Sequence, residues 1–123
     1  MLPKWLLICA TKPEWGELKK HLRFEKDHTF HGLNFYRAET DKKEIFLAQV
    51  GPGYESASER AGLVFRSADR PDMVIHFGLS GALTENLKEG DLILPTGIVN
   101  AHKQSAAVSP RWIQKSRLLL QEL

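Results

Sequence analysis

The segment Val74–Leu83, VIHFGLSGAL, changes within ten residues from an apolar run into a turn that contains two glycines. The run from Met73 to Phe77 is typical of a buried strand, because short continuous apolar runs occur in sheets that are covered on both faces. Gly78 and Gly81 let the backbone turn sharply and expose main-chain N–H groups, since no Cβ stands in the way. The segment therefore predicts a strand whose carboxyl end is open to a ligand.

Composition limits the class of protein. The chain has 123 residues, 42% of them hydrophobic, which is enough for one domain with a real core. The chain has seventeen Lys and Arg and fifteen Asp and Glu, with the two signs interspersed. Neither a nucleic acid nor an anionic membrane is therefore an expected partner. The single cysteine, Cys9, lies in an apolar run too short to span a membrane. We expect a cytoplasmic protein without a targeting segment.

The rest of the chain alternates strand-like and helix-like segments. Further strands are predicted from the runs Trp5–Ala10 and Asp91–Val99, and a hairpin from Leu33–Ala38 and Glu44–Val50, with a short strand before it near Phe30. Helices are predicted from Thr11 to Leu22, from Ala57 to Ala68 before Asp69–Pro71, and from Ser109 onward. This alternation predicts a three-layer α/β fold, with a mixed, mostly parallel sheet flanked by helices, in a single domain over residues 1–123.

Three strand ends carry residues suited to a binding site. In an open α/β sheet, ligands bind beyond the carboxyl ends of the strands. The ends in question are Thr11–Glu14, Gly51–Gly53 and Gly78–Gly81. We therefore predict a site that contains Glu14, Gly51, Gly53, Gly78, Leu79, Ser80 and Gly81. The alternative is that the glycines only close tight turns and that Glu14 only complements a helix dipole.

Other residues are candidate cofactor-binding, stacking or metal-binding groups. Gly51–Ser56 lacks the third glycine of the dinucleotide-binding pattern, so no cofactor is predicted. His76 and Phe77 are expected in the core, although Phe77 or Tyr54 would also suit stacking on a base or ribose. The remaining histidines show no metal-ligand spacing, and no metal site is predicted.

Four patches, in order along the chain, resemble one known family. They are LICATKPE (7–14), GPGYESA (51–57), PDMVIHFGLSGAL (71–83) and LKEGDLILP (87–95). Together they are similar to the nucleoside phosphorylase and nucleosidase superfamily. That superfamily includes methylthioadenosine/S-adenosylhomocysteine nucleosidases, futalosine hydrolases and hopanoid-associated phosphorylase-like proteins, and Val108–Trp112 resembles the last group.

The resemblance implies cleavage of the N-glycosidic bond of a purine-type nucleoside. Such a bond breaks through a cationic, oxocarbenium-like sugar. Glu14 matches the carboxylate with which hydrolytic members bind and activate water. Phosphorylases place arginine and serine around phosphate at positions that match His76 and Leu79 here. Hydrolysis with water is therefore favoured over phosphorolysis with phosphate, although nucleosidases carry serine where this chain has Leu79.

The resemblance also implies a longer domain. Family members continue for about as many residues again, and their second half supplies an Asp that protonates the purine and a Glu that binds the ribose hydroxyls. The chain is therefore expected to be an N-terminal half, with a small-molecule nucleoside as ligand and a homo-oligomeric assembly. The alternative is a catalytically silent remnant, or a domain that binds a nucleoside or a partner protein without turnover.

Overall fold

The computed structural model describes residues 2–67 and 70–120, which form two compact units divided after Gly81. Residues 1–81 hold the sheet and all the predicted site residues. Residues 82–123 hold a small hairpin and a helix. The prediction of a single domain stays a prediction, and each unit is described by itself.

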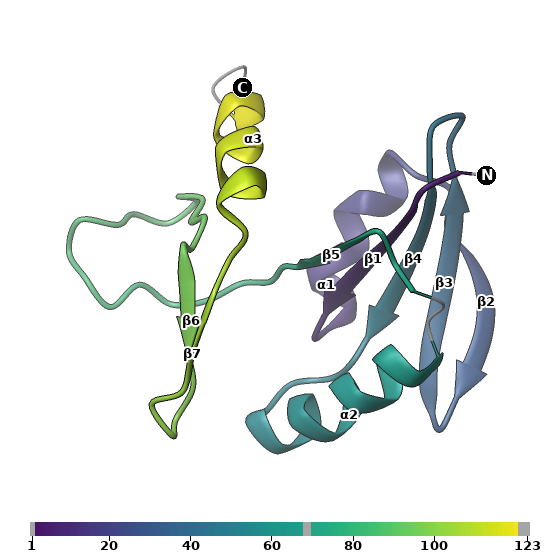
Figure 1. Cartoon of the computed structure of the whole chain (residues 1–123), viewed down its shortest axis with the longest axis horizontal. Helices are drawn as coiled ribbons and strands as arrows, with labels where there is room; N and C mark the ends of the chain where they lie inside the picture. The colour runs from purple at the N-terminus through teal and green to yellow at the C-terminus, as the bar shows by residue number, and fades with distance from the viewer. Residues whose placement is uncertain (1, 68–69, 121–123) are drawn as a thin grey trace. The chain divides into compact units, whose positions relative to one another are not determined.

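A five-stranded sheet with the order β2-β3-β4-β1-β5 forms the first unit (Figure 1). Its strands are β1 (Lys4–Cys9), β2 (Glu25–Phe30), β3 (Leu33–Glu39), β4 (Glu44–Gln49) and β5 (Met73–His76). Strand β1 pairs in parallel with β4 and β5, whereas β3 is antiparallel to both β2 and β4. Only β3 therefore runs against the other strands of this sheet, which confirms the mixed, mostly parallel sheet.

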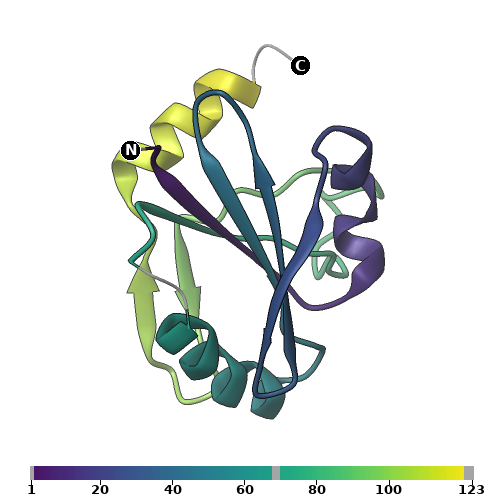
Figure 2. The ribbon, with the colours of Figure 1, turned by 90° about the vertical axis from the view of Figure 1, so that its right-hand side faces the viewer.

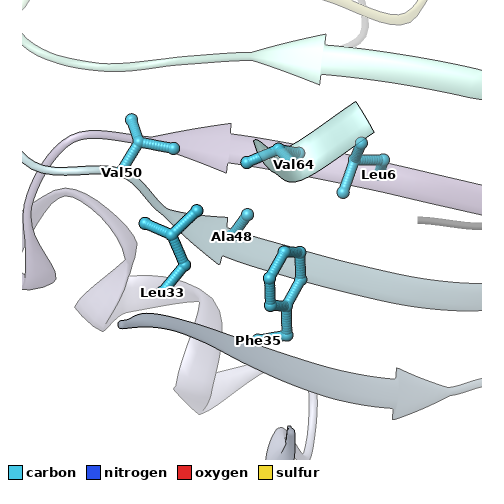
Figure 3. Close-up of a cluster of buried hydrophobic side chains, with 6 residues drawn as sticks. All are labelled: Leu6, Leu33, Phe35, Ala48, Val50 and Val64. Atoms are coloured by element: carbon cyan, nitrogen blue, oxygen red, sulfur yellow. The ribbon is translucent and has the colours of Figure 1, made fainter. Parts of the chain in front are cut away.

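Helices cover both faces of this sheet. On one face, Val64 of α2 (Tyr54–Ser67) is fully buried in a cluster with strand residues (Figure 3); the cluster comprises Leu6, Leu33, Phe35, Ala48, Val50 and Val64. On the other face, Trp15 of α1 (Lys12–Trp15) is only 1% exposed, and its indole Nε1 donates to Gln49 Oε1 at 3.0 Å. Figure 2 shows the two helical segments on opposite sides of the strands. The predicted three layers are confirmed.

The apolar run near the N-terminus forms the central strand, as its composition predicts. Leu6 and Leu7 of β1 are buried on opposite faces of the sheet, one in each core cluster. The hairpin of β3 and β4 and the short strand β2 before it are also confirmed. The turn between β3 and β4 is closed by a hydrogen bond from the Thr40 N–H to the Lys43 carbonyl at 2.9 Å.

The helix expected from Thr11 to Leu22 is shorter than predicted. It begins after Thr11 and continues beyond Trp15 as a 3₁₀ helix, η1 (Gly16–Lys20). Glycine is a poor residue for a helix interior. Leu18 of the tighter helix, and Leu22 just after it, still pack against the Trp15 cluster. Helix α2 is confirmed, and Ala68 and Asp69 at its predicted end lie outside the described residues.

Strand β5 corrects the prediction of a strand buried on both faces. Met73 and Ile75 are partly buried, whereas Val74 is 42% exposed and His76 is also exposed. The reason is position, because β5 lies at the end of the strand order and pairs with β1 alone among the described strands. The expectation that His76 is a core histidine was therefore wrong.

The second unit contains β6 (Gly97–Val99), β7 (Ser105–Ala107) and α3 (Pro110–Leu120). Only the end of the predicted strand 91–99 is regular, because β7 pairs with residues 97–99 alone. Leu92 is 71% exposed. Pro95 also interrupts the strand, since it has no N–H to donate to a ladder. The final helix is confirmed: the N–H groups of Trp112 and Ile113 both donate to the Ser109 carbonyl at 3.1 Å.

Candidate functional site

The carboxyl ends of β4, β1 and β5 are neighbours, and hydrogen bonds extend past the end of each strand. Beyond β4, the N–H groups of Val50 and Gly51 donate to the carbonyls of Cys9 and Ala10 at 2.9 and 2.8 Å. Beyond β5, the Phe77 N–H donates to the Ile8 carbonyl at 3.1 Å. The three predicted loops therefore start side by side at one edge of the sheet, with the β1 loop in the middle.

Glu14 is held by four hydrogen bonds from two loops. Its Oε1 accepts from the N–H of Ala10 at 3.0 Å, the N–H of Thr11 at 2.8 Å and the Thr11 hydroxyl at 3.0 Å. This is the capping box that a T-x-x-E sequence forms at the start of a helix. Its Oε2 accepts from the N–H of Leu79 at 2.8 Å, across 65 residues of sequence. Glu14 therefore caps α1 and also links the β1 and β5 loops.

The two carboxylate oxygens of Glu14 differ in their remaining capacity. A carboxylate has about four lone-pair positions in total, two on each oxygen. Oε1 already accepts three hydrogen bonds, whereas Oε2 accepts one from the described residues. Glu14 is also partly exposed at the sheet edge. Oε2 is therefore the oxygen that can accept a further hydrogen bond from water or from a ligand hydroxyl.

Glu14 is an anion at neutral pH. Burial acts to raise the pKa of its carboxyl, but the hydrogen bonds from Leu79, Thr11 and Ala10 outweigh burial and lower this pKa below its usual value. A fixed, ionised carboxylate attracts a cationic group and repels an anionic one. It is also a weaker base than an ordinary glutamate.

Gly78 is needed for this arrangement. A Cβ at this position would collide with Oε2 of Glu14, and that oxygen is held in place by the Leu79 N–H. The glycine therefore makes room for the carboxylate. This reason differs from the general turn flexibility that the sequence indicated.

Gly51 has a different role. Its φ is +84°, which favours glycine, and a Cβ there would lie 2.6 Å from Nη1 of Arg60. The same nitrogen donates to the Val50 carbonyl at 2.7 Å. Sequence reasoning missed Arg60, although its spacing of four residues from Val64 was a usable signal, since it places both side chains on one helix face.

The remaining predicted residues lie at the same sheet edge. Gly53 has a φ of +98° directly before α2. Ser80 and Gly81 are exposed in the loop after β5, and Leu79 has a side chain 84% exposed, so its backbone makes the contact with Glu14. Phe77 packs with the Trp15 cluster, as predicted. The Tyr54 side chain lies outside the described ones.

A separate hollow lies in the second unit. It has a volume of about 540 Å³ and is lined by Thr96, Ala107, Val108, Pro110, Ile113, Gln114 and Arg117. None of the predicted site residues lines it. We place the candidate site at the sheet edge, because the chemically active groups meet there.

Residues 2–67 and 70–120 offer neither a metal site nor a membrane-spanning helix. No cluster of three or more His, Cys, Asp or Glu side chains there could hold a metal ion. Likewise, no helix in those residues has the length and apolar character needed to cross a membrane.

Comparison with protein families identifies the chain's relatives. The family described as the phosphorylase superfamily matches residues 4–118. The chain belongs to the phosphorylase superfamily. The resemblance predicted from the four sequence patches is therefore confirmed, and the α/β fold at residues 1–81 is the fold of a phosphorylase-superfamily member.

Individual relatives of this superfamily chain are nucleosidases. It is 30% identical over 93 residues to the 5′-methylthioadenosine/S-adenosylhomocysteine nucleosidase of Staphylococcus haemolyticus, covering 76% of this chain and 40% of that protein. It is 32% identical over 89 residues to the Buchnera aphidicola enzyme of the same name, covering 72% and 38%. The chain thus spans about two fifths of the curated relatives it matches.

Solved structures share the fold of this superfamily chain. The S-adenosylhomocysteine nucleosidase of Streptococcus pyogenes, in complex with 5-methylthiotubericidin, matches with a TM-score of 0.80 at 21% identity, covering 98% of this chain and 58% of that one. The futalosine hydrolase of Helicobacter pylori matches with a TM-score of 0.81 at 17% identity, covering 99% and 59%. At these identities the likeness shows the fold alone.

Proposed function

We propose that the chain supplies the water-binding half of a nucleosidase site, which hydrolyses the N-glycosidic bond of a purine-type nucleoside. One observation carries this proposal: Glu14 is fixed between two loops, with Oε2 free to accept a further hydrogen bond. The nucleosidase names of the curated relatives support it.

The chemistry follows from the charge and position of Glu14. As the bond between the anomeric carbon and the base breaks, its electron pair leaves with the base, which takes up a proton from solvent. The sugar becomes cationic, and a carboxylate close to it stabilises that charge. A water bound to Oε2 is oriented toward the anomeric carbon, adds its oxygen there and passes a proton to the carboxylate. Because the pKa of Glu14 is lowered, orientation and charge contribute more than basicity.

Water suits this site better than phosphate as the second substrate. Ionised Glu14 would repel a phosphate anion. Leu79 offers an apolar side chain, and His76 offers an exposed imidazole in place of a fixed guanidinium. We therefore propose hydrolysis and not phosphorolysis.

Two further proposals concern the setting. We propose a cytoplasmic protein, because Cys9 is a free thiol. We also propose a homo-oligomer, because several large apolar side chains in the second unit are exposed, Leu83 and Val99 among them.

The test compares two variants of the protein, Glu14→Gln and Glu17→Gln, by the rate at which each hydrolyses methylthioadenosine. Glu17 is a matched control, because it is an exposed carboxylate on the neighbouring 3₁₀ helix that pairs only with Lys20 in the described interactions. Release of adenine should fall by a factor of about 10² to 10⁴ in Glu14→Gln and stay unchanged in Glu17→Gln. Added phosphate should not increase the rate.

Binding provides a second measurement. Methylthio-immucillin-A is the ligand in the structure of the Neisseria meningitidis nucleosidase. Calorimetry should show weaker binding by Glu14→Gln than by Glu17→Gln. Equal hydrolysis and equal binding by the two variants would reject the role of Glu14. Binding without any turnover would favour the silent, nucleoside-binding alternative, and a rate that requires phosphate would favour phosphorolysis.

A further inference from the structure

The Val50–Gly51 peptide is held from both sides. Its carbonyl accepts a hydrogen bond from Arg60 Nη1 at 2.7 Å, and its N–H donates to the Ala10 carbonyl at 2.8 Å. A peptide unit is planar, so fixing both of its polar groups fixes its orientation. This peptide leads directly into the turn 51–53 of the candidate site.

A second peptide carries the constraint on to Glu14. This is the Ala10–Thr11 peptide: its carbonyl, from Ala10, accepts the Gly51 N–H at 2.8 Å, and its N–H, from Thr11, donates to Oε1 of Glu14 at 2.8 Å. Arg60 and Glu14 are therefore joined by a continuous line of hydrogen bonds through the Val50–Gly51 and Ala10–Thr11 peptides. The line runs from α2 on one face of the sheet to α1 on the other.

The helix delivers the guanidinium of Arg60 to a fixed place. Val64, one turn further along α2, is fully buried in the same cluster as the Val50 side chain (Figure 3). Residues four apart lie on one helix face. Packing at Val64 therefore holds the face of α2 that carries Arg60 against the end of β4, and the guanidinium lies directly over Gly51.

We propose that Arg60 is a positioning residue, which holds the turn 51–53 and, through Ala10, the Glu14 carboxylate. The role of the turn and of the carboxylate in nucleoside cleavage rests on the proposed function. The hydrogen-bond line itself does not. Arg60 acts on the site from outside it, because its contact is with the Val50 carbonyl.

The experiment compares Arg60→Met, which keeps the length of the side chain and removes the donors, with Arg60→Lys, which keeps the charge and one donor group. Arg66→Met is the matched control, because Arg66 lies on the same helix and, among the described residues, its Nε donates within α2, to the Gly62 carbonyl at 3.3 Å. Two readouts are used: exchange of the Gly51 amide hydrogen, and the carboxyl carbon shift of Glu14 followed by NMR against pH.

Arg60→Met should speed exchange of the Gly51 amide by about fivefold to tenfold, as expected for one hydrogen bond. The titration midpoint of Glu14 should rise toward that of an ordinary glutamate. Arg60→Lys should restore much of both, and Arg66→Met should change neither. A merely stabilising residue would change the melting temperature but not the Glu14 midpoint.

A folded Arg60→Met with unchanged Gly51 exchange and an unchanged Glu14 midpoint would overturn the inference. If Arg60→Met does not fold, Arg60→Gln is measured against the same two criteria. Neither readout needs a nucleoside. Expected responses in a protein that neither binds nor hydrolyses one would keep the Arg60 role and reject the proposed function.

Discussion

Substitution of Gly78 by alanine is the most direct test of the Glu14 geometry. The added Cβ collides with Oε2 of Glu14, so the carboxylate must rotate away from the Leu79 N–H. Gly81 is the matched control, because it lies in the same loop and a Cβ there meets no atom within 4 Å. A glycine needed only for turn flexibility would give the two variants similar behaviour.

The size of the effect follows from the bond that is lost. A hydrogen bond to a charged group contributes about 1.5–3 kcal/mol when well buried. The Leu79 loop is exposed, so water replaces part of this and about 1 kcal/mol is expected. Rotation of the Glu14 side chain from its preferred conformation adds about 0.5–1.5 kcal/mol. Gly78→Ala should therefore lower the free energy of unfolding by about 1.5–2.5 kcal/mol, whereas Gly81→Ala should leave it unchanged or raise it by about 0.4–1 kcal/mol.

The loss should depend on pH in a defined direction. The pKa of Glu14 is lower in the folded chain than in the unfolded one. Its contribution to stability is thus fully present above the ordinary glutamate value of about 4.3, and it is lost as the pH falls through the lowered, folded value. The difference between wild type and Gly78→Ala should be constant from pH 7 to about pH 5 and should then shrink in more acid solution.

Urea unfolding of wild type, Gly78→Ala and Gly81→Ala at pH 7 and at pH 3 provides the measurement. Equal stabilities of the two variants at pH 7, or a Gly78→Ala deficit that persists undiminished at pH 3, would refute the steric and electrostatic reasoning.

Two other outcomes follow from burial and exposure. Burial, with a smaller effect from the nearby Glu14 charge, raises the pKa of Cys9 to about 11, so at pH 8 only about 0.1% of this cysteine is thiolate. A thiol reagent should therefore react with Cys9 at the rate of unfolding. Fast reaction in native buffer would contradict this. The exposed apolar side chains of the second unit, such as Leu83 at 98% and Leu92 at 71%, should cause self-association at micromolar concentration; a sedimentation profile of monomer alone, independent of concentration, would contradict this.

The layers of the fold were predictable because the spacing of apolar residues along a strand or helix reflects which side chains are buried. The apolar run of β1 and the alternating pattern of the hairpin carry this signal directly. Strand β5 shows the limit of the method. Its run is as apolar as that of β1, but its exposure depends on which strands pair with it, and a local pattern does not contain that information.

The candidate site also has features that the local sequence predicts and features that it does not. The helix predicted from Thr11 placed Glu14 at a helix start, and the strand-end glycines placed the loops at one sheet edge. The bond from Leu79 to Glu14 spans 65 residues, so no local rule predicts it. Arg60 is the clearest omission: its spacing from Val64 indicates the helix face on which it lies, but its contact with Val50 depends on the turn between β4 and α2.

The order of the strands also has a kinetic consequence. Strands β2, β3 and β4 are sequence neighbours and pair through short loops, whereas β1 reaches β4 across 40 residues, from Lys4 to Glu44, and β5 across 68, from Trp5 to Met73. Closing longer loops costs more chain entropy, so β5 is expected to dock last and to detach first. The Leu79 amide reaches Glu14 only after that docking step. A molecule in which β5 has not yet docked would keep the β2-β3-β4-β1 sheet but lack the hydrogen bond from Leu79 to Glu14. Glu14 therefore reaches its final geometry only when the whole sheet has formed.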